Sequence, residues 1–163
     1  MQYQIDQSGK IEDTSRLTIV AFADGKAKSL KISAVEKQKL IKIMLELDYP
    51  RNIFIFKIFA GLIYLLLIKE KWNSGDSLLI DREYPGHEGI IKDILSNLFR
   101  KIFSQLPVIE FGEIGKKSSA HLKAIAVFRG KANPNMTVKA DDVLNILYQQ
   151  KNRWSARSRR ENP

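Results

Sequence analysis

The chain has 163 residues, of which 44% are hydrophobic and 28% charged, a balance typical of one globular domain with a substantial core. It contains no cysteine, which excludes a disulfide framework and a thiolate zinc site and favours a cytoplasmic location. The 27 Lys and Arg residues against 18 Asp and Glu give a net charge of +9, which predicts an anionic partner, nucleic acid before a membrane surface.

Three consecutive strands are predicted at the start of the chain. Residues 3–7 alternate in polarity before a Ser-Gly turn, and residues 17–23 form an apolar run. Asp24-Gly25 is a strong hairpin signal that joins this run to residues 26–33. The three strands are therefore expected to pair antiparallel.

A helix is predicted to follow. Ser33 and Glu36 have the spacing of a capping box at its start. Its expected apolar face consists of Leu40, Ile41, Met44, Leu45 and Leu47.

Residues 53–68 form the most apolar segment of the chain. Its 16 residues include Lys57, whereas a membrane span needs about 18–20 uninterrupted apolar residues. A helix that is apolar on nearly every face is typical of a protein core. We therefore expect a buried helix and no membrane partner, and residues 1–10 show no signal-peptide pattern.

The remainder of the chain alternates strands and helices. The expected elements are a strand ending at Asp81, a helix over 87–103, a strand over 108–115, a helix over 118–130 and a last helix to about Gln150, opened by Thr137 or Asp141. Residues 1–150 are predicted to form one α/β domain with a five-stranded mixed sheet flanked by helices. Residues 151–163 are predicted to be a disordered basic tail.

This order of elements resembles the ribonuclease H-like fold over roughly residues 1–130. Enzymes of that superfamily hold an Asp in the first strand, a Glu near the start of the first helix and an Asp at the end of the fourth strand. The matching residues are Asp6 in YQIDQSGK, Glu36 in SAVEKQKL and Asp81 in LLIDREY, with Tyr84 as the aromatic residue that often follows. A fourth ligand usually lies in the last helix, where SSAHLKAIA offers His121, similar to some Holliday-junction resolvases.

The resemblance implies a metal-dependent nuclease acting on DNA or RNA, with Asp6, Glu36, Asp81 and His121 as metal ligands. Two Mg²⁺ or Mn²⁺ ions about 4 Å apart can activate water and stabilise the leaving oxygen of a phosphodiester, and hard cations need oxygen ligands. Each residue also has a structural alternative: Asp6 in a turn, Glu36 in a capping box, Asp81 opening a turn before Pro85-Gly86, and His121 packed in the core. A module that has kept the fold and lost turnover therefore stays an alternative.

Basic residues and a hydroxyl are the candidates for contact with nucleic acid. Lys116, Lys117 and Ser118 stand at an expected helix N-terminus, which suits a phosphate and equally a plain helix cap. The tail adds sequence-independent cations, or serves only as a solubilising segment. The predicted contacts are Lys10, Lys116, Lys117, Ser118, Arg153, Arg157, Arg159 and Arg160. A homodimer is left open.

Overall fold

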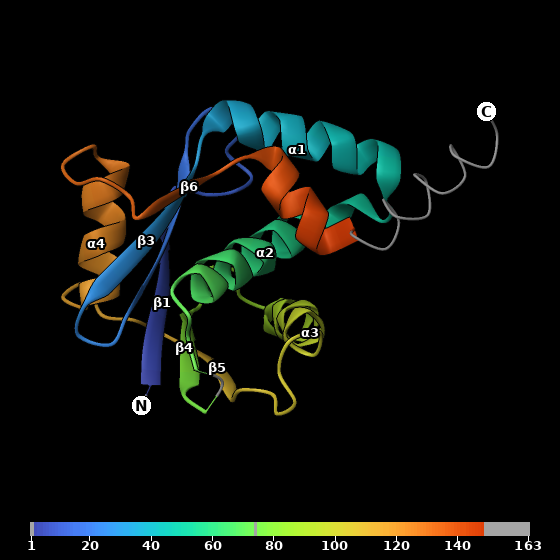
Figure 1. Ribbon diagram of the computed structural model, residues 1–163. Helices are drawn as coiled ribbons and strands as arrows, with labels where there is room; N and C mark the ends of the chain where they lie inside the picture. Colours follow the sequence, from blue (N-terminus) through green and yellow to red (C-terminus); the bar gives the residue numbers. More distant parts are fainter. Residues whose placement is uncertain (1, 74, 149–163) are drawn as a thin grey trace.

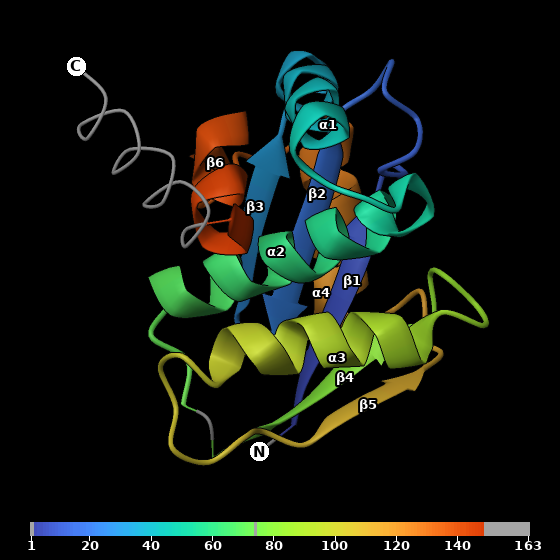
Figure 2. The ribbon, with the colours of Figure 1, turned by 90° about the vertical axis from the view of Figure 1, so that its right-hand side faces the viewer.

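The computed structural model describes residues 2–73 and 75–148, which form a mixed sheet covered by helices on both faces (Figure 1). The strands are β1 (Gln2–Ser8), β2 (Thr18–Ala23), β3 (Ala27–Ile32), β4 (Ser77–Asp81), β5 (Ile109–Gly112) and β6 (Met136–Val138). The helices are α1 (Ala34–Leu47), the 3₁₀ turn η1 (Arg51–Ile53), α2 (Phe54–Lys69), α3 (Glu88–Phe99) and α4 (Ser119–Phe128), and residues 140–148 are also helical. Figure 2 shows α2 and α3 in front of the sheet and α4 behind it. The predicted α/β class is confirmed.

The first three strands pair antiparallel, as the sequence predicts. Residues Gln4–Ser8 of β1 pair with β2, and β2 pairs along its full length with β3. The hairpin turn contains Gly25 at a φ of 137°, and the Asp24 carboxylate accepts a hydrogen bond from the amide of Lys26. All six residues of β2 are buried because this strand lies in the middle of the sheet, between helices on both faces.

The sheet has six strands within the described residues, so the prediction of five is wrong. β4 runs parallel to β1 and β5 parallel to β4, while β6 adds a parallel strand beside β3. β6 has three residues and shows too short an alternation to be found from sequence. Its register depends on a contact distant in sequence, because Asn135 exchanges hydrogen bonds with the backbone of Ser29.

The apolar helix α2 lies inside the domain. Residues 51–69 are long and apolar enough to cross a membrane, with a mean hydropathy of 1.9. Ten residues of α2 are nevertheless buried, and the helix packs between the sheet and α3 (Figure 2). Packing in the core therefore accounts for its composition, as predicted for residues 53–68.

Helix α1 carries a lysine that is fully buried. Ser33 caps the helix by accepting a hydrogen bond from the amide of Glu36 at 3.2 Å. One residue further on, the Lys37 ammonium donates to the carbonyls of Lys10 and Asp13, at 3.1 and 2.6 Å, and to the Thr18 hydroxyl at 3.0 Å. Burial lowers the pKa of Lys37. Lys37 thereby ties the loop between β1 and β2 to α1.

Asp48 connects three helical segments at the end of α1. Its carboxylate bonds to the Lys57 ammonium of α2 and accepts a 2.6 Å hydrogen bond from the Tyr148 hydroxyl. The Tyr49 amide donates to the same carboxylate at 2.7 Å. Burial by itself raises the pKa of Asp48, but these bonds outweigh it and lower the pKa to about 2.

Asp48→Asn is expected to lower the free energy of unfolding at neutral pH by about 1 kcal/mol, given the partial exposure to solvent. The folded pKa lies below the ordinary value of 3.8, so the contribution of the charge is present above that value and is lost as pH falls towards 2. Urea denaturation across this range measures it, with the exposed Glu46→Gln on the same helix as control. A difference between wild type and Asp48→Asn that does not shrink on acidification would contradict the account.

Candidate metal centre

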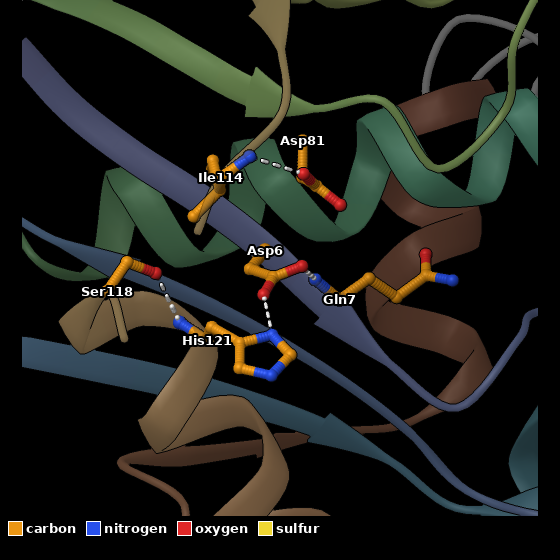
Figure 3. Close-up of polar contacts among 6 residues, drawn as sticks. All are labelled: Asp6, Gln7, Asp81, Ile114, Ser118 and His121. Carbon is orange, nitrogen blue, oxygen red and sulfur yellow. Dashed lines mark hydrogen bonds and ion pairs between the residues drawn. The ribbon is translucent and has the colours of Figure 1, made fainter. Parts of the chain in front are cut away.

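Two neighbouring parallel strands bring Asp6 and Asp81 to one edge of the sheet. Ile5 of β1 is in register with Ile80 of β4, so the two aspartates follow side by side. Ile5 and Ile80 face the core under α2 and α3. Because side chains alternate along a strand, Asp6 and Asp81 face the side covered by α4 (Figure 3).

Asp6 is held from two sides. It is only 2% exposed. One carboxylate oxygen accepts the amide of Gln7 at 2.8 Å, and the other lies 2.7 Å from Nδ1 of His121 (Figure 3). The structure therefore brings His121 and Asp6 together through a direct side-chain contact, while their role as metal ligands stays a prediction.

His121 reaches Asp6 because of how α4 begins. The hydroxyl of Ser118 accepts the amide of His121 at 3.1 Å, which makes Ser118 the cap of the helix. The cap fixes the first turn, and the imidazole then projects towards the sheet (Figure 3). The sequence left open whether Ser118 binds a phosphate or caps the helix, and the structure shows that it caps the helix.

Asp81 is anchored by the chain that follows β5. The amide of Ile114 donates to its carboxylate at 2.8 Å (Figure 3). The aspartate at the end of β4 is thus oriented by a neighbouring segment.

Glu83 completes a group of three carboxylates that sequence reasoning missed. Asp6, Asp81 and Glu83 each offer an oxygen within 4.8 Å of the others. Burial, together with the charges of the two aspartates, raises the pKa of Glu83 to about 8. Glu83 lies outside β4, in the turn that follows it, so no periodic pattern in the sequence points to it.

Glu36 is not brought into this group. Its carboxylate accepts the amide of Ala140 at 2.8 Å, at the start of helical residues 140–148. Helix α1 follows β3, which is two strands away from β1 in the sheet. The predicted convergence of Glu36 with Asp6 and Asp81 is therefore absent from the described structure, and the side chain fixes one helix start to another.

The predicted nucleic-acid contacts divide into two sets. Lys10, Lys116 and Lys117 are exposed. Lys10 follows the end of β1, and the other two precede α4, so these cations come from segments that flank the carboxylates. Ser118 is the helix cap described above, and the other four, Arg153, Arg157, Arg159 and Arg160, lie outside the described residues, as does the predicted tail.

A polar network adjoins the centre. The side-chain amide of Gln7 donates to the Tyr84 hydroxyl at 3.0 Å, and that hydroxyl lies 3.4 Å from the Glu12 carboxylate. Burial raises the pKa of Tyr84, so the phenol stays protonated. Tyr84 also contacts the rings of Phe56 and Phe59, which attaches the segment carrying Asp81 and Glu83 to α2.

The chain was compared with models of protein families, with curated proteins and with solved structures, and none of these comparisons found a match.

In metal-free buffer, Glu83→Gln is expected to raise the melting temperature at pH 8 by about 2–4 °C, the shift that about 1 kcal/mol produces in a domain of this size. The pKa of Glu83 is raised from 4.5 to about 8, so its ionisation opposes folding increasingly between these values and fully above them. Thermal unfolding measures the difference.

Added Mg²⁺ should raise the melting temperature of the wild type and have a smaller effect on Glu83→Gln. The control is Glu110→Gln, an exposed acid on β5, which should respond to Mg²⁺ like the wild type. Equal Mg²⁺ responses in all three proteins would show that Glu83 takes no part in binding a cation.

Proposed function

We propose that this protein is a metal-dependent nuclease, related to the ribonuclease H-like enzymes, that hydrolyses phosphodiester bonds of nucleic acid. The observation that carries the proposal is the convergence of ligand oxygens of Asp6, Asp81 and Glu83 within 4.8 Å of one another, from two adjacent strands and the turn after β4. Three carboxylate oxygens suit a hard divalent cation such as Mg²⁺ or Mn²⁺. Burial first, and then repulsion from the two aspartates, raise the pKa of Glu83, and a bound cation would relieve that repulsion.

The arrangement of the sheet supports the same proposal. Five of its strands follow the order β3-β2-β1-β4-β5, with the first three antiparallel and the last two parallel to β1. This agrees with the fold that the sequence resembles, in which the first strand lies at the centre and carries the first acid. β6 is an addition at the edge beside β3.

Each residue of the centre has a distinct part in the proposed reaction. Asp6, Asp81 and Glu83 would hold the cation, which supplies Lewis-acid activation of water and of the phosphate when bound. His121 positions Asp6 through Nδ1, and the amide of Ile114 positions Asp81. His121 is thus a positioning residue for Asp6 in this proposal, in place of the fourth ligand that the resemblance implies.

The electrostatics support nucleic acid as the substrate. The chain carries a net charge of +9, and the exposed Lys10, Lys116 and Lys117 flank the acidic centre. A phosphate backbone approaching three carboxylates needs such cations nearby, because the acids repel it. A cytoplasmic location, where nucleic acid and Mg²⁺ are both present, is part of this proposal.

Cleavage assays test the function directly. The full chain is incubated with end-labelled single-stranded and duplex DNA and RNA in Mg²⁺, Mn²⁺ or EDTA. Cleavage is expected in Mg²⁺ and Mn²⁺ and none in EDTA. Binding of nucleic acid with no cleavage under any metal would overturn the nuclease and leave the alternative, a binding module that keeps the fold without turnover.

A further inference from the structure

A hollow of about 380 Å³ lies beside the candidate metal centre, at the same edge of the sheet. Both β1 and β3 run antiparallel to β2, so the end of β3 and the start of β2 lie at the edge where β1 ends. The end of α4 forms another wall. The lining includes Ser15, Arg16, Leu17, Lys31, Ser33 and Phe128. We call this hollow the Arg16 pocket.

The Arg16 pocket is related to the metal centre by helix α4. His121, which contacts Asp6, stands near the start of α4, and Phe128 is its last residue. Seven residues of helix correspond to about 10 Å at 1.5 Å per residue. A chain-like ligand of a few units can therefore occupy the pocket and the metal centre at once.

Arg16 and Phe128 form a stacking surface in the pocket. The guanidinium carbon of Arg16 lies 5.0 Å from the centroid of the Phe128 ring. The ring is fixed in place by close packing on Gly9, where an added Cβ would come within 2.6 Å of it. A planar guanidinium over an aromatic ring is a surface on which a nucleobase stacks.

Two cations give the pocket its charge. Lys31 is half-buried in the wall, and Arg16 is exposed. Neither forms an ion pair with a carboxylate of the described residues, and the nearby Asp13 carboxylate is engaged by the amide and hydroxyl of Ser15. Both cations are thus available for a phosphate.

We propose that the Arg16 pocket binds one nucleotide of a single strand, with the base stacked on Arg16 and Phe128 and its phosphate beside Lys31. The volume of 380 Å³ falls among pockets for small molecules, so it admits a base as well as a phosphate. A base in a duplex reaches such a pocket only after unpairing, which disfavours the binding of a duplex. Resting on the proposed nuclease function, this assigns single-stranded nucleic acid as the substrate class.

Equilibrium binding in EDTA tests the pocket separately from cleavage. Fluorescence anisotropy measures the affinity of the full chain for a labelled oligothymidylate and for a duplex containing the same strand. The single strand is expected to bind more tightly. Arg16→Lys, which keeps the charge and removes the planar guanidinium, should weaken single-strand binding about tenfold, in line with the loss of a stacking contact, and change duplex binding little.

The matched control is Arg129→Lys, the same exchange at an exposed residue just after Phe128 and outside the lining. It should leave both affinities unchanged. Lys31→Gln should reduce the slope of log K against log salt for single-strand binding by about one. Lys28→Gln, on the same strand and outside the lining, should leave that slope unchanged.

Three outcomes would overturn the proposal: equal losses of single-strand and duplex affinity in Arg16→Lys, an effect of Arg129→Lys as large as that of Arg16→Lys, or competition by thymidine monophosphate as strong as that of the oligonucleotide. The last would identify a free-nucleotide pocket instead. Because no metal is present, failure of the nuclease proposal leaves these measurements intact, and their failure leaves the cleavage and Mg²⁺ experiments intact.

Discussion

Asp81→Asn is expected to lower Mg²⁺-dependent cleavage by about 100-fold or more, at least the loss that follows removal of a residue supporting a metal ligand. The exchange removes a ligand charge at the half-buried end of β4. Asparagine keeps an oxygen that can accept the amide of Ile114, now 2.8 Å from Asp81, so the local fold should persist. Initial cleavage rates at saturating Mg²⁺ measure the effect, and thermal unfolding checks the fold.

The control for this exchange is Asp93→Asn, at an exposed position on α3 away from the carboxylates. It changes the net charge by the same amount and should leave cleavage near that of the wild type. Wild-type cleavage rates in Asp81→Asn would exclude Asp81 as a metal ligand. Equal losses in both variants would show that the effect comes from the change in net charge alone.

Lys37→Met is expected to lower the free energy of unfolding by about 3 kcal/mol. Methionine is of similar length but cannot donate, so the carbonyls of Lys10 and Asp13 and the hydroxyl of Thr18 lose the ammonium that now contacts them. A buried acceptor left without a partner costs about 1–3 kcal/mol, and removing the buried charge offsets part of the sum. Urea denaturation measures the change.

Lys39→Met is the matched control, because Lys39 lies two residues further along α1 and is exposed. It should change stability by less than about 0.5 kcal/mol. If Lys37→Met is as stable as this control, the hydrogen bonds of the buried ammonium contribute no net stability. The cleavage rate of Lys37→Met, compared with that of Lys39→Met, measures whether the loop between β1 and β2 helps to position the substrate.

Much of the sheet was determined by signals within short segments. Alternation in β1, the Asp24-Gly25 turn and the apolar run of β2 each specify a strand and its direction without distant contacts. Asp6 and Asp81 could be placed for the same reason. Asp6 belongs to an alternating strand and Asp81 ends an apolar run, and the parallel pairing of the two strands brings the residues side by side.

The candidate site was only partly determined in this way. Glu36 has one sequence spacing that suits both a metal ligand and a helix cap, and a contact with Ala140, 104 residues later, settles where its carboxylate lies. Glu83 follows Asp81 in the turn after β4, where no periodic pattern orients a side chain. Its position near the aspartates depends on how this turn packs against α2 through the ring of Tyr84.

Helix α1 shows most clearly what the sequence determines by itself and what depends on the tertiary structure. Its sequence determined that it is a helix and that Ser33 caps it, because propensity and capping act within one turn. Its buried face was decided by the tertiary structure: Leu45 and Leu47 are 40% and 42% exposed, whereas Lys37 is fully buried. Hydrophobicity predicts the reverse, but the loop between β1 and β2 presents two carbonyl oxygens and the start of β2 a hydroxyl, all of which the Lys37 ammonium contacts. Only folding brings that loop against the helix.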